Sequence, residues 1–286
     1  MNSVISSMIE KYQPTSKKER ENAINEVLQE IVLAGLSRSD FFSKAAFYGG
    51  TCLRIFYGLN RFSEDLDFAL ISKDESFNLN DYFPSIKKEL ASYGIEMELS
   101  SKAKDNTDVQ TAFAKGDETS LFMLFFSQND SLGISKDQKI KIKFEVDMNN
   151  PNGGITETKY RFLPAPCEVK VFDESTLFSG KIHAIICRDY KNRVKGRDYY
   201  DYLFYCGKGT KINLDYLKNK LINTGKIKAD DEFSIDSVKS LLKERFEIVN
   251  YVLAKEDVKL FIKEKETLNV WSKDLFLATL DNLNAN

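Results

Sequence analysis

The sequence contains only one histidine, His183, and its four cysteines form no CxxC pair. Few residues are therefore available as zinc ligands, and we expect the cysteines to be free thiols in a reducing compartment. The same scarcity argues against Ser-His-Asp chemistry, for which one histidine would have to serve alone. No run of about 18 apolar residues is present, so we expect no membrane span. The formal net charge is −2, so any basic surface for nucleic acid must be local.

What is present is typical of a globular protein. Of the 286 residues, 42% are apolar and 29% are charged, which leaves room for two modest domains. The first twenty residues lack the order of basic, apolar and small residues found in signal peptides. We therefore expect a cytoplasmic protein.

The hydrophobic pattern predicts helices and strands in the first half and mostly helices in the second. A helix is expected over 15–40, with a capping box at Ser16 and Glu19 and an end at Gly35. A further helix is expected over 80–94, and one after the glycine pair at 49–50. Strands are expected at 45–48, 64–71, 95–99, 120–126 and 139–148. After residue 154 the pattern becomes mostly helical, with helices over 173–190 and over 196–207, the second closed by Gly207.

These elements predict an α+β fold with a boundary near 165–175. We expect one domain over residues 1–170 and a helical domain over residues 171–286 that completes the active site.

The stretch FYGGTCLRIFYGLNRFSEDLDF, residues 47–68, carries the first candidate site. A glycine pair after a strand lets backbone N–H groups approach a phosphate, and Thr51 could add a hydroxyl or cap the next helix. A Gly-Gly turn without a ligand is the commoner structural alternative.

Asp65 and Asp67 recur two residues apart, which places them on one side of a strand with Cβ atoms roughly 6–7 Å apart. Two such carboxylates suit Mg²⁺, which prefers carboxylates together with substrate phosphates. The alternative is a solvated strand face. A third carboxylate could come from Glu145 or Asp147, although Lys141 and Lys143 on the same strand face also fit a solvated, charged edge.

A second candidate site lies in SGKIHAIICRDYKNRVKGRDYYDYLFYC, residues 179–206. Lys181 lies beside a predicted core stripe, where a lysine must reach solvent or meet an anion. Asp198 and Asp201 share one helix face. Interleaved tyrosines favour a wall that faces substrate, against the alternative of a surface charge cluster with pairs such as Arg197–Asp201, and His183 is interpreted as structural. Possible RNA contacts in the basic loop are Arg188, Lys191, Arg193, Lys195 and Arg197.

Both stretches together resemble the AbiEii-type nucleotidyltransferase toxins of the DNA polymerase β-like superfamily. The shared features are Gly-Gly-Thr, then Arg-x-Ser-x-Asp-x-Asp, and later a helical lysine followed by Arg-Asp-x-x-Asp. The chain departs from the family where Ser179 and Gly180 precede Lys181. The resemblance implies a polymerase β-like core with a mostly helical C-terminal lobe.

The resemblance also implies roles for individual residues. Asp65 and Asp67 would bind Mg²⁺ or Mn²⁺, Lys181 would contact the nucleotide, and Asp198, or alternatively Asp201, would complete the catalytic set. Ser63 matches a serine that an antitoxin phosphorylates in related toxins. The residues that would bind the nucleoside triphosphate are Gly49, Gly50, Thr51, Arg54 and Lys181.

We therefore expect a metal-dependent nucleotidyltransferase toxin of a toxin–antitoxin or phage-defence system. The predicted acceptor is a tRNA 3′ end, and an AbiEi-type antitoxin is the predicted partner. The alternatives are transfer to a protein hydroxyl and a non-catalytic nucleotide-binding subunit. A kinase is less favoured, because neither a phosphate-binding loop of the GxxxxGK[ST] type nor the kinase signature set is present.

Overall fold

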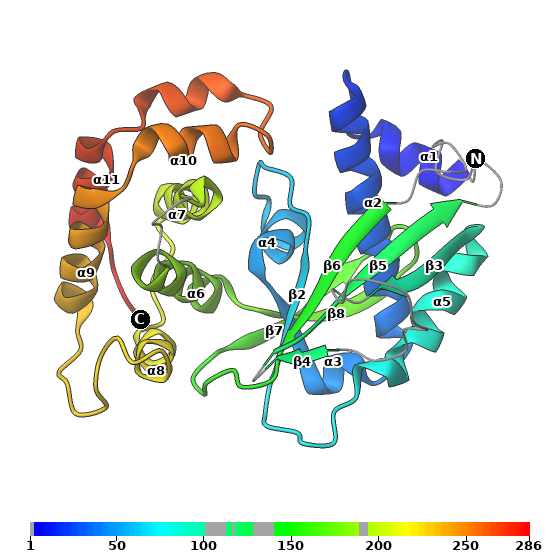
Figure 1. The fold of residues 1–286 in the computed structure, drawn as a ribbon, viewed down its shortest axis with the longest axis horizontal. Coiled ribbons are helices and arrows are strands. Elements are labelled where there is room, and N and C mark those ends of the chain that lie inside the picture. The colour runs from blue at the N-terminus through cyan, green and yellow to red at the C-terminus, as the bar shows by residue number, and fades with distance from the viewer. Residues whose placement is uncertain (1–2, 101–112, 116–117, 128–139, 189–193) are drawn as a thin grey trace. The chain divides into compact units, whose positions relative to one another are not determined.

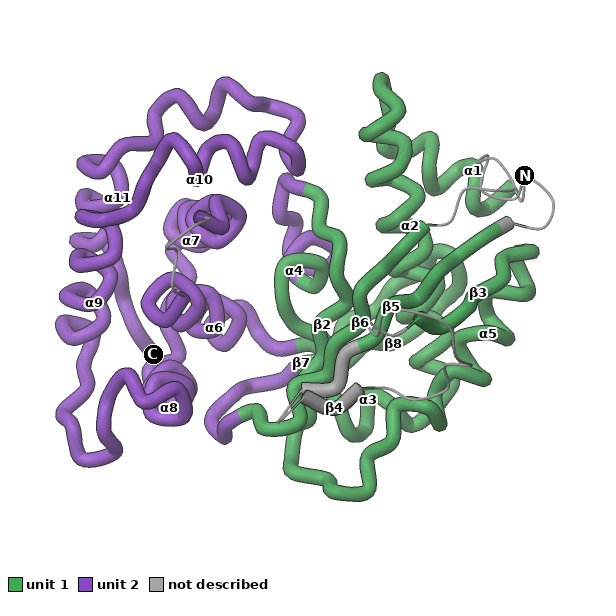
Figure 2. The backbone as a smooth tube through the Cα atoms, viewed as in Figure 1, with its two compact units in different colours: residues 1–52, 62–150, 157–171 green, residues 53–61, 151–156, 172–286 purple. Residues whose placement is uncertain are grey.

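The computed structural model describes all residues except 1–2, 101–112, 116–117, 128–139 and 189–193. Lys191 and Arg193, two of the predicted RNA contacts, lie outside the described residues. The chain forms two compact units (Figure 2). Unit 1 contains residues 1–52, 62–150 and 157–171, and unit 2 contains 53–61, 151–156 and 172–286. The predicted domain division at 170 remains a prediction.

Unit 1 is built on a mixed sheet that has eight strands within the described residues (Figure 1). The strand order is β3-β5-β6-β2-β1-β8-β7, and β4 pairs with β5. Strand β2 is parallel to β6 and antiparallel to β1, which places it inside the sheet. The strands are β1 (Ala45–Tyr48), β2 (Leu66–Leu70), β3 (Ile95–Ser100), β4 (Phe113–Lys115), β5 (Glu118–Ser127), β6 (Ile140–Asp147), β7 (Thr156–Arg161) and β8 (Cys167–Phe172).

The predicted strands of the first half are confirmed. Along β6, buried and more exposed residues alternate, as the period of two requires. The helical prediction was wrong for β7 and β8. Strand β7 lies at the edge of the sheet and reads TETKYR, so it carries no apolar alternation that a pattern could reveal.

The predicted helices of unit 1 are present, with one correction at the end of α2, whereas α1 and α3 were not predicted. Ser16 accepts a hydrogen bond from the Glu19 N–H and caps α2, but α2 continues through Gly35 to Ser37. A Cβ at Gly35 would lie 2.8 Å from Ile86 Cα, so this glycine permits close packing of α2 on α5 rather than ending the helix. The helical elements are α1 (Ser3–Glu10), α2 (Lys17–Ser37), α3 (Phe41–Lys44), the start of α4 (Gly49–Tyr57), η1 (Leu79–Tyr82) and α5 (Phe83–Ser92).

Aromatic rings fill the core of unit 1 around β2. Phe68 of β2 packs on Phe144 of β6 with ring centroids 4.8 Å apart, and on Phe47 of β1 at 5.0 Å. All three side chains are fully buried. Because Phe68 points into this core, Asp67 points to the other face of the sheet.

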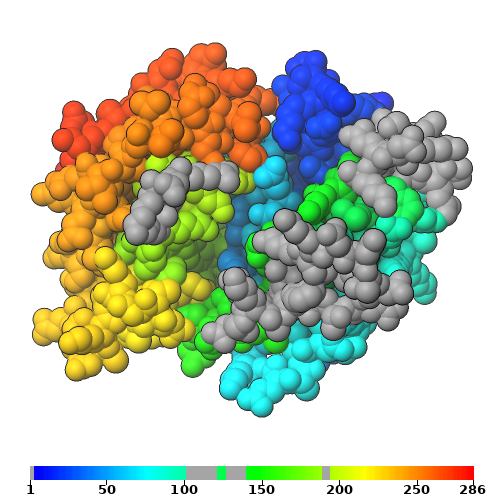
Figure 3. All heavy atoms as spheres, viewed as in Figure 1, coloured from blue at the N-terminus to red at the C-terminus, as the bar shows by residue number. Residues whose placement is uncertain are grey.

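Within the described residues, unit 2 is mostly helical, and both its earlier helices (yellow-green) and its later ones (yellow to red) are visible in Figure 3. Phe178, Ile182 and Ile185 form the predicted core stripe of α6 and are fully buried. Helix α7 ends at Gly209 (φ +65°), not at Gly207. The helical elements are α6 (Glu174–Cys187), α7 (Gly196–Lys208), α8 (Leu214–Asn223), α9 (Ile235–Ile248), α10 (Tyr251–Val258), η2 (Lys265–Val270), α11 (Lys273–Thr279) and η3 (Leu280–Asn282).

Among the described residues, no helix has both the length and the apolar character that crossing a membrane requires.

Candidate active site

The glycine pair lies where β1 turns into α4, as predicted. Gly49 has φ +79°, a backbone conformation that favours glycine. A Cβ at this position would also overlap the carboxylate of Asp67. Position 49 therefore requires glycine for two reasons: the backbone bend, and the Asp67 carboxylate that lies against it.

Thr51 is fully buried in the first turn of α4. Its hydroxyl donates a hydrogen bond to the backbone carbonyl of Asp65 at 2.5 Å. The hydroxyl that was predicted to reach phosphate is thus directed at the chain segment that carries the first aspartate.

The two aspartates lie at the start of β2. Asp65 comes directly before the strand, and Asp67 lies within it. In the register of the sheet, Asp67 is opposite Glu145 of the parallel strand β6, whereas Asp147 is opposite Ala69. Asp147 also accepts a hydrogen bond from the Asn149 N–H at 3.0 Å. The register therefore favours Glu145, which forms an ion pair with Lys143, as the third carboxylate.

This donor set fits a magnesium ion that takes its remaining ligands from substrate. Within the described part of the chain, no group of three histidine, cysteine or acidic side chains could hold a metal ion alone. Mg²⁺ is usually bound by one or two carboxylates, with water and substrate phosphates completing its octahedron. Asp65 and Asp67 provide that number, and Gly49 provides the space in which the Asp67 carboxylate lies.

Ser63, the predicted phosphorylation site, lies in the segment between α4 and β2. The side chain of Gln29, on α2, donates a hydrogen bond to the Ser63 carbonyl at 3.1 Å. Gln29 is fully buried, and Ser63 is half-buried.

In unit 2, Lys181 of α6 meets both aspartates of α7. Its ammonium lies 2.7 Å from Asp198 Oδ1 and 2.8 Å from Asp201 Oδ2. Both aspartates are fully buried, and Arg188 forms an ion pair with the other oxygen of Asp198. Lys181 thus contacts anions, as its position beside the core stripe predicted.

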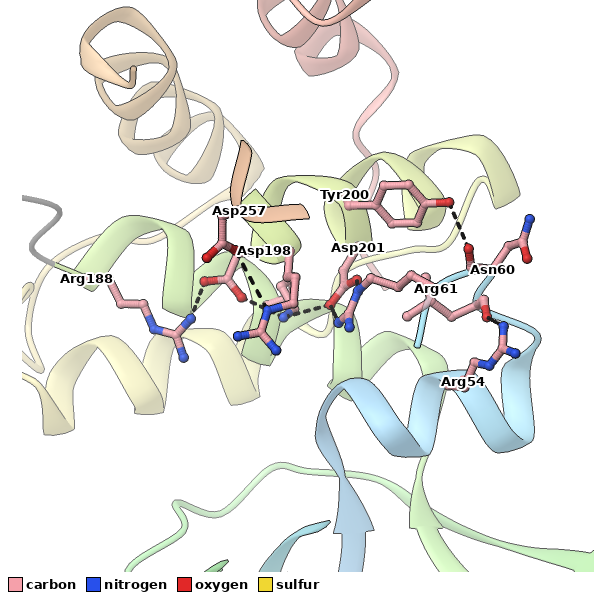
Figure 4. A network of polar contacts seen from close by, with 11 residues as sticks. Arg54, Asn60, Arg61, Arg188, Asp198, Tyr200, Asp201 and Asp257 are labelled. Atoms are coloured by element: carbon pink, nitrogen blue, oxygen red, sulfur yellow. Dashed lines mark hydrogen bonds and ion pairs between the residues drawn. The ribbon is translucent and has the colours of Figure 1, made fainter. Parts of the chain in front are cut away.

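Arg61 is a member of this cluster that sequence reasoning missed. Its Nε and Nη2 atoms donate to the two oxygens of Asp201 at 2.6 and 2.7 Å, a bidentate pair that is almost completely buried. The arginine of the Arg-x-Ser-x-Asp-x-Asp motif was the only signal that could have indicated it. Figure 4 shows Arg61 and Asp201 directed at each other.

The ion pairs keep both aspartates ionised. Burial alone would raise the pKa of Asp198, but Lys181 and Arg188 outweigh it and hold that pKa far below its ordinary value. Burial likewise opposes ionisation of Asp201, and Arg61 and Lys181 lower its pKa. Neither carboxylate is therefore suited to accept a proton near neutral pH.

The basic residues of this region differ in their surroundings. Arg188 is exposed in part, and the pKa of Lys195 is lowered by burial and by Arg188 nearby. Arg197 instead lies 3.7 Å from Asp257 and over the ring of Phe261, and Asp201 pairs with Arg61 and Lys181, so the alternative of an Arg197–Asp201 pair is not what the structure shows. Its inward placement does not favour an RNA contact at Arg197.

One further expectation about α7 changes, and the start of the helix is confirmed. Tyr199, Tyr202 and Tyr205 are fully buried core residues, so the prediction that they face substrate was wrong. The helix begins at Gly196, where a glycine is needed because a Cβ would collide with the Ala254 carbonyl of α10.

Two other residues have local contacts. Arg54 donates to the Leu59 carbonyl at 2.9 Å, within the turn that follows α4. His183 lies 3.2 Å from the Thr224 hydroxyl, and burial, with Lys220 nearby, lowers its pKa to about 4, which agrees with the structural interpretation.

Comparison with known families decides what this arrangement belongs to. The family described as nucleotidyl transferase AbiEii toxin, type IV toxin–antitoxin system, matches residues 31–276. The chain belongs to the AbiEii nucleotidyltransferase toxin family. It is therefore a nucleotidyl-transfer enzyme, and membership implies a nucleoside triphosphate substrate and an antitoxin partner. The family resemblance drawn from the two motifs is confirmed.

Solved structures support the fold of this AbiEii-family protein. The nucleotidyltransferase toxin MenT4 from Mycobacterium tuberculosis is 16% identical, with a TM-score of 0.60 over 98% of this chain and 90% of that one. JHP933 from Helicobacter pylori is 18% identical, with a TM-score of 0.51 over 94% of this chain and 95% of that one. No curated protein matches the sequence. The predicted α+β nucleotidyltransferase fold with a helical C-terminal part is confirmed.

Proposed function

We propose that this AbiEii-family toxin transfers a nucleotide from a nucleoside triphosphate to a tRNA 3′ end and that the reaction requires Mg²⁺ or Mn²⁺. The observation that carries the proposal is the pair Asp65 and Asp67 at the start of an interior strand, with the Asp67 carboxylate lying against the Gly49 bend. Residues 171–286 are proposed to form a domain that supplies the remaining catalytic residues.

Asp65 and Asp67 would hold the metal ion, which would take its remaining ligands from water and substrate phosphates. Glu145, opposite Asp67 in the sheet register, would be a further carboxylate beside this pair. When bound, the ion neutralises charge on the triphosphate and orients the reacting oxygens. The backbone N–H groups at Gly49 and Gly50 would bind phosphate oxygens at the start of α4. Arg54 remains a proposed nucleotide contact.

In the transfer step, the acceptor hydroxyl oxygen forms a bond to the α-phosphorus, and the bond from that phosphorus to pyrophosphate breaks. The hydroxyl proton passes to solvent. Lys181 would stabilise negative charge on the triphosphate. Burial of Asp198 and its two cationic partners favour the role of a positioning residue for Lys181 over that of a general base.

The tRNA acceptor is proposed because AbiEii proteins are toxins and tRNA modification blocks translation. Arg188 and Lys195, with Lys191 and Arg193 outside the described residues, would contact the RNA backbone. Because tRNA is a cytoplasmic molecule, the enzyme is proposed to act in the cytoplasm.

Phosphorylation of Ser63 by an AbiEi-type antitoxin is the proposed regulation. A phosphoserine carries about −1.5 to −2 charge at neutral pH. Placed two residues before Asp65, this charge would repel the incoming triphosphate and compete for the metal ion.

The test is incubation of the purified protein with each labelled nucleoside triphosphate, Mg²⁺, and total RNA or total protein from the host. We expect label in the tRNA band, loss of label with EDTA, and no label with Asp65→Ala at an unchanged or raised thermal midpoint. Label on protein alone would replace tRNA by a protein hydroxyl as acceptor. Nucleotide binding without label anywhere would indicate a non-catalytic subunit.

A further inference from the structure

Two fully buried side chains fix the segment that leads into β2. Gln29 donates to the Ser63 carbonyl at 3.1 Å, and Thr51 donates to the Asp65 carbonyl at 2.5 Å. The donors come from α2 and α4, and both lie in unit 1. Alternate carbonyls of one short segment are thus held from two different helices.

These contacts determine where the Asp65 carboxylate can point. The Thr51 hydrogen bond fixes the peptide plane that follows Asp65, and the next residue, Leu66, is already in register with Phe144 of β6. With the backbone held on both sides, the Cα–Cβ direction of Asp65 is set, and the position of its carboxylate then depends on its side-chain torsions.

The same glycine-threonine segment also limits Asp67. The bend at Gly49 leaves the space in which the Asp67 carboxylate lies, and Tyr48, the preceding residue, is in register with Asp67. Residues 49–51 therefore contact the second aspartate through Gly49 and the first through Thr51.

Hydroxyl chemistry separates this role from phosphate binding. A threonine hydroxyl has one proton to donate, and an ionised phosphate oxygen only accepts hydrogen bonds. Thr51 gives its proton to the Asp65 carbonyl, and its side chain is 0% exposed. It has no second proton with which to bind phosphate.

The hydrogen bond from Gln29 to the segment before β2 leaves the other polar atom of its amide group unsatisfied. Its Oε1 atom is buried and has no hydrogen-bond partner among the described residues. A buried unsatisfied acceptor is destabilising, and a methionine or leucine at this position would avoid that cost. The amide is therefore explained by the one hydrogen bond it does form, to Ser63.

We propose that Thr51 and Gln29 are positioning residues that orient the metal-binding carboxylate of Asp65, and that Thr51 is not a phosphate ligand. The inference rests on the proposed function, because it takes Asp65 as a metal ligand. It assigns the Gly-Gly-Thr segment mainly to support of the aspartates and leaves phosphate contact to backbone N–H groups.

The experiment compares Thr51→Val, which keeps the shape without the hydroxyl, with Thr51→Ser, which keeps the hydroxyl, and with Gln29→Met. Binding of Mn²⁺ alone is measured by the electron paramagnetic resonance signal of free Mn²⁺, with Asp65→Ala as the background. Loss of such outer contacts typically weakens metal binding about 10–100-fold. We expect about tenfold weaker Mn²⁺ binding for Thr51→Val and Gln29→Met, and a change below about threefold for Thr51→Ser.

Steady-state kinetics supply the second readout. At saturating metal, we expect the KM for nucleoside triphosphate to stay within about twofold in Thr51→Val, since no phosphate contact is lost. A raised KM with unchanged Mn²⁺ binding would make Thr51 a phosphate ligand and overturn the proposal. Unchanged Mn²⁺ binding in both Thr51→Val and Gln29→Met would overturn it as well.

Failure of the two proposals can be told apart. A wild-type protein that labels no acceptor contradicts the proposed function, whereas the Mn²⁺ titration needs no turnover. If Thr51→Val does not fold, as judged by circular dichroism, Gln29→Met tests the same segment from the other helix.

Discussion

Replacement of Arg61 by methionine should destabilise unit 2 strongly. Arg61 and Asp201 form two hydrogen bonds of 2.6 and 2.7 Å with almost no solvent exposure. Removing one partner of a buried ion pair costs about 3–5 kcal/mol, because the other charge is left without compensation. Asp201 keeps Lys181 at 2.8 Å, so we expect the lower end, about 3 kcal/mol. Lysine at position 61 keeps the charge but not the forked geometry, and should cost about 1–2 kcal/mol.

The fluorescence of Trp271 provides the assay. It is the only tryptophan in the sequence, it is buried, and it lies in unit 2, so a denaturant titration followed at this residue reports on that unit. A loss below about 1 kcal/mol for the methionine variant, the value of an exposed ion pair, would refute the reasoning.

The pH dependence of this loss has a definite sign. Burial raises the pKa of Asp201, but Arg61 and Lys181 lower it by more than burial raises it. The net result is a pKa below the ordinary value of an aspartate. The stability from the pair is therefore fully present above pH 4 or so, the unfolded pKa, and is lost as pH falls through the folded pKa. The difference between wild type and the methionine variant should narrow in acid and stay constant from pH 6 upward.

Three further predictions concern the same unit. Gly180→Ala should stabilise α6 by about 0.5–1 kcal/mol, because a Cβ at this position would meet no described atom within 4 Å. The matched variant Gly196→Ala should destabilise the protein by about 1–3 kcal/mol or more, because its Cβ would collide with the Ala254 carbonyl. Equal midpoints of the two variants in a denaturant titration would contradict both predictions. Burial, with Lys220 nearby, lowers the pKa of His183 from 6.5 to about 4, so stability should fall by about 1–2 kcal/mol between pH 6.5 and 4 once solvent screening is allowed for. His183→Gln should remove that slope in unfolding curves, and a slope that persists would assign it to other groups. Asp198→Asn should lower kcat by a similar factor from pH 6 to 9, because the Asp198 pKa lies far below this range; an acid limb present only in the wild-type pH profile would restore Asp198 as a general base.

Local patterns predicted the parts of the site that depend on neighbouring residues. Asp198 and Asp201, three residues apart on a helix, were expected on one face, and both contact Lys181. The bend at Gly49 followed from a glycine pair after a strand. Each of these inferences needs only the period of a helix or strand and the backbone freedom of glycine.

What the sequence could not reveal depends on residues far apart in the chain. Arg61 and Asp201 are 140 positions apart, and Gln29 and Ser63 are 34 apart. No window of helical or strand periodicity contains such a pair. Strand β7 was missed for a different reason: none of its residues is buried, so its sequence carries no alternation of apolar residues.

The arginines supply positive charge that the proposed contact of Lys181 with a triphosphate requires. One ammonium and two carboxylates alone would give a site with a formal charge of −1, which repels phosphate. Arg61 on Asp201 and Arg188 on Asp198 bring these five described side chains to a formal charge of +1. Each carboxylate is shared between two cations, so it orients the ammonium of Lys181 without cancelling its charge. The proposed phosphate contact of Lys181 therefore requires basic partners for Asp198 and Asp201, and Arg61 supplies one of them, although the sequence analysis had given this residue no role of its own.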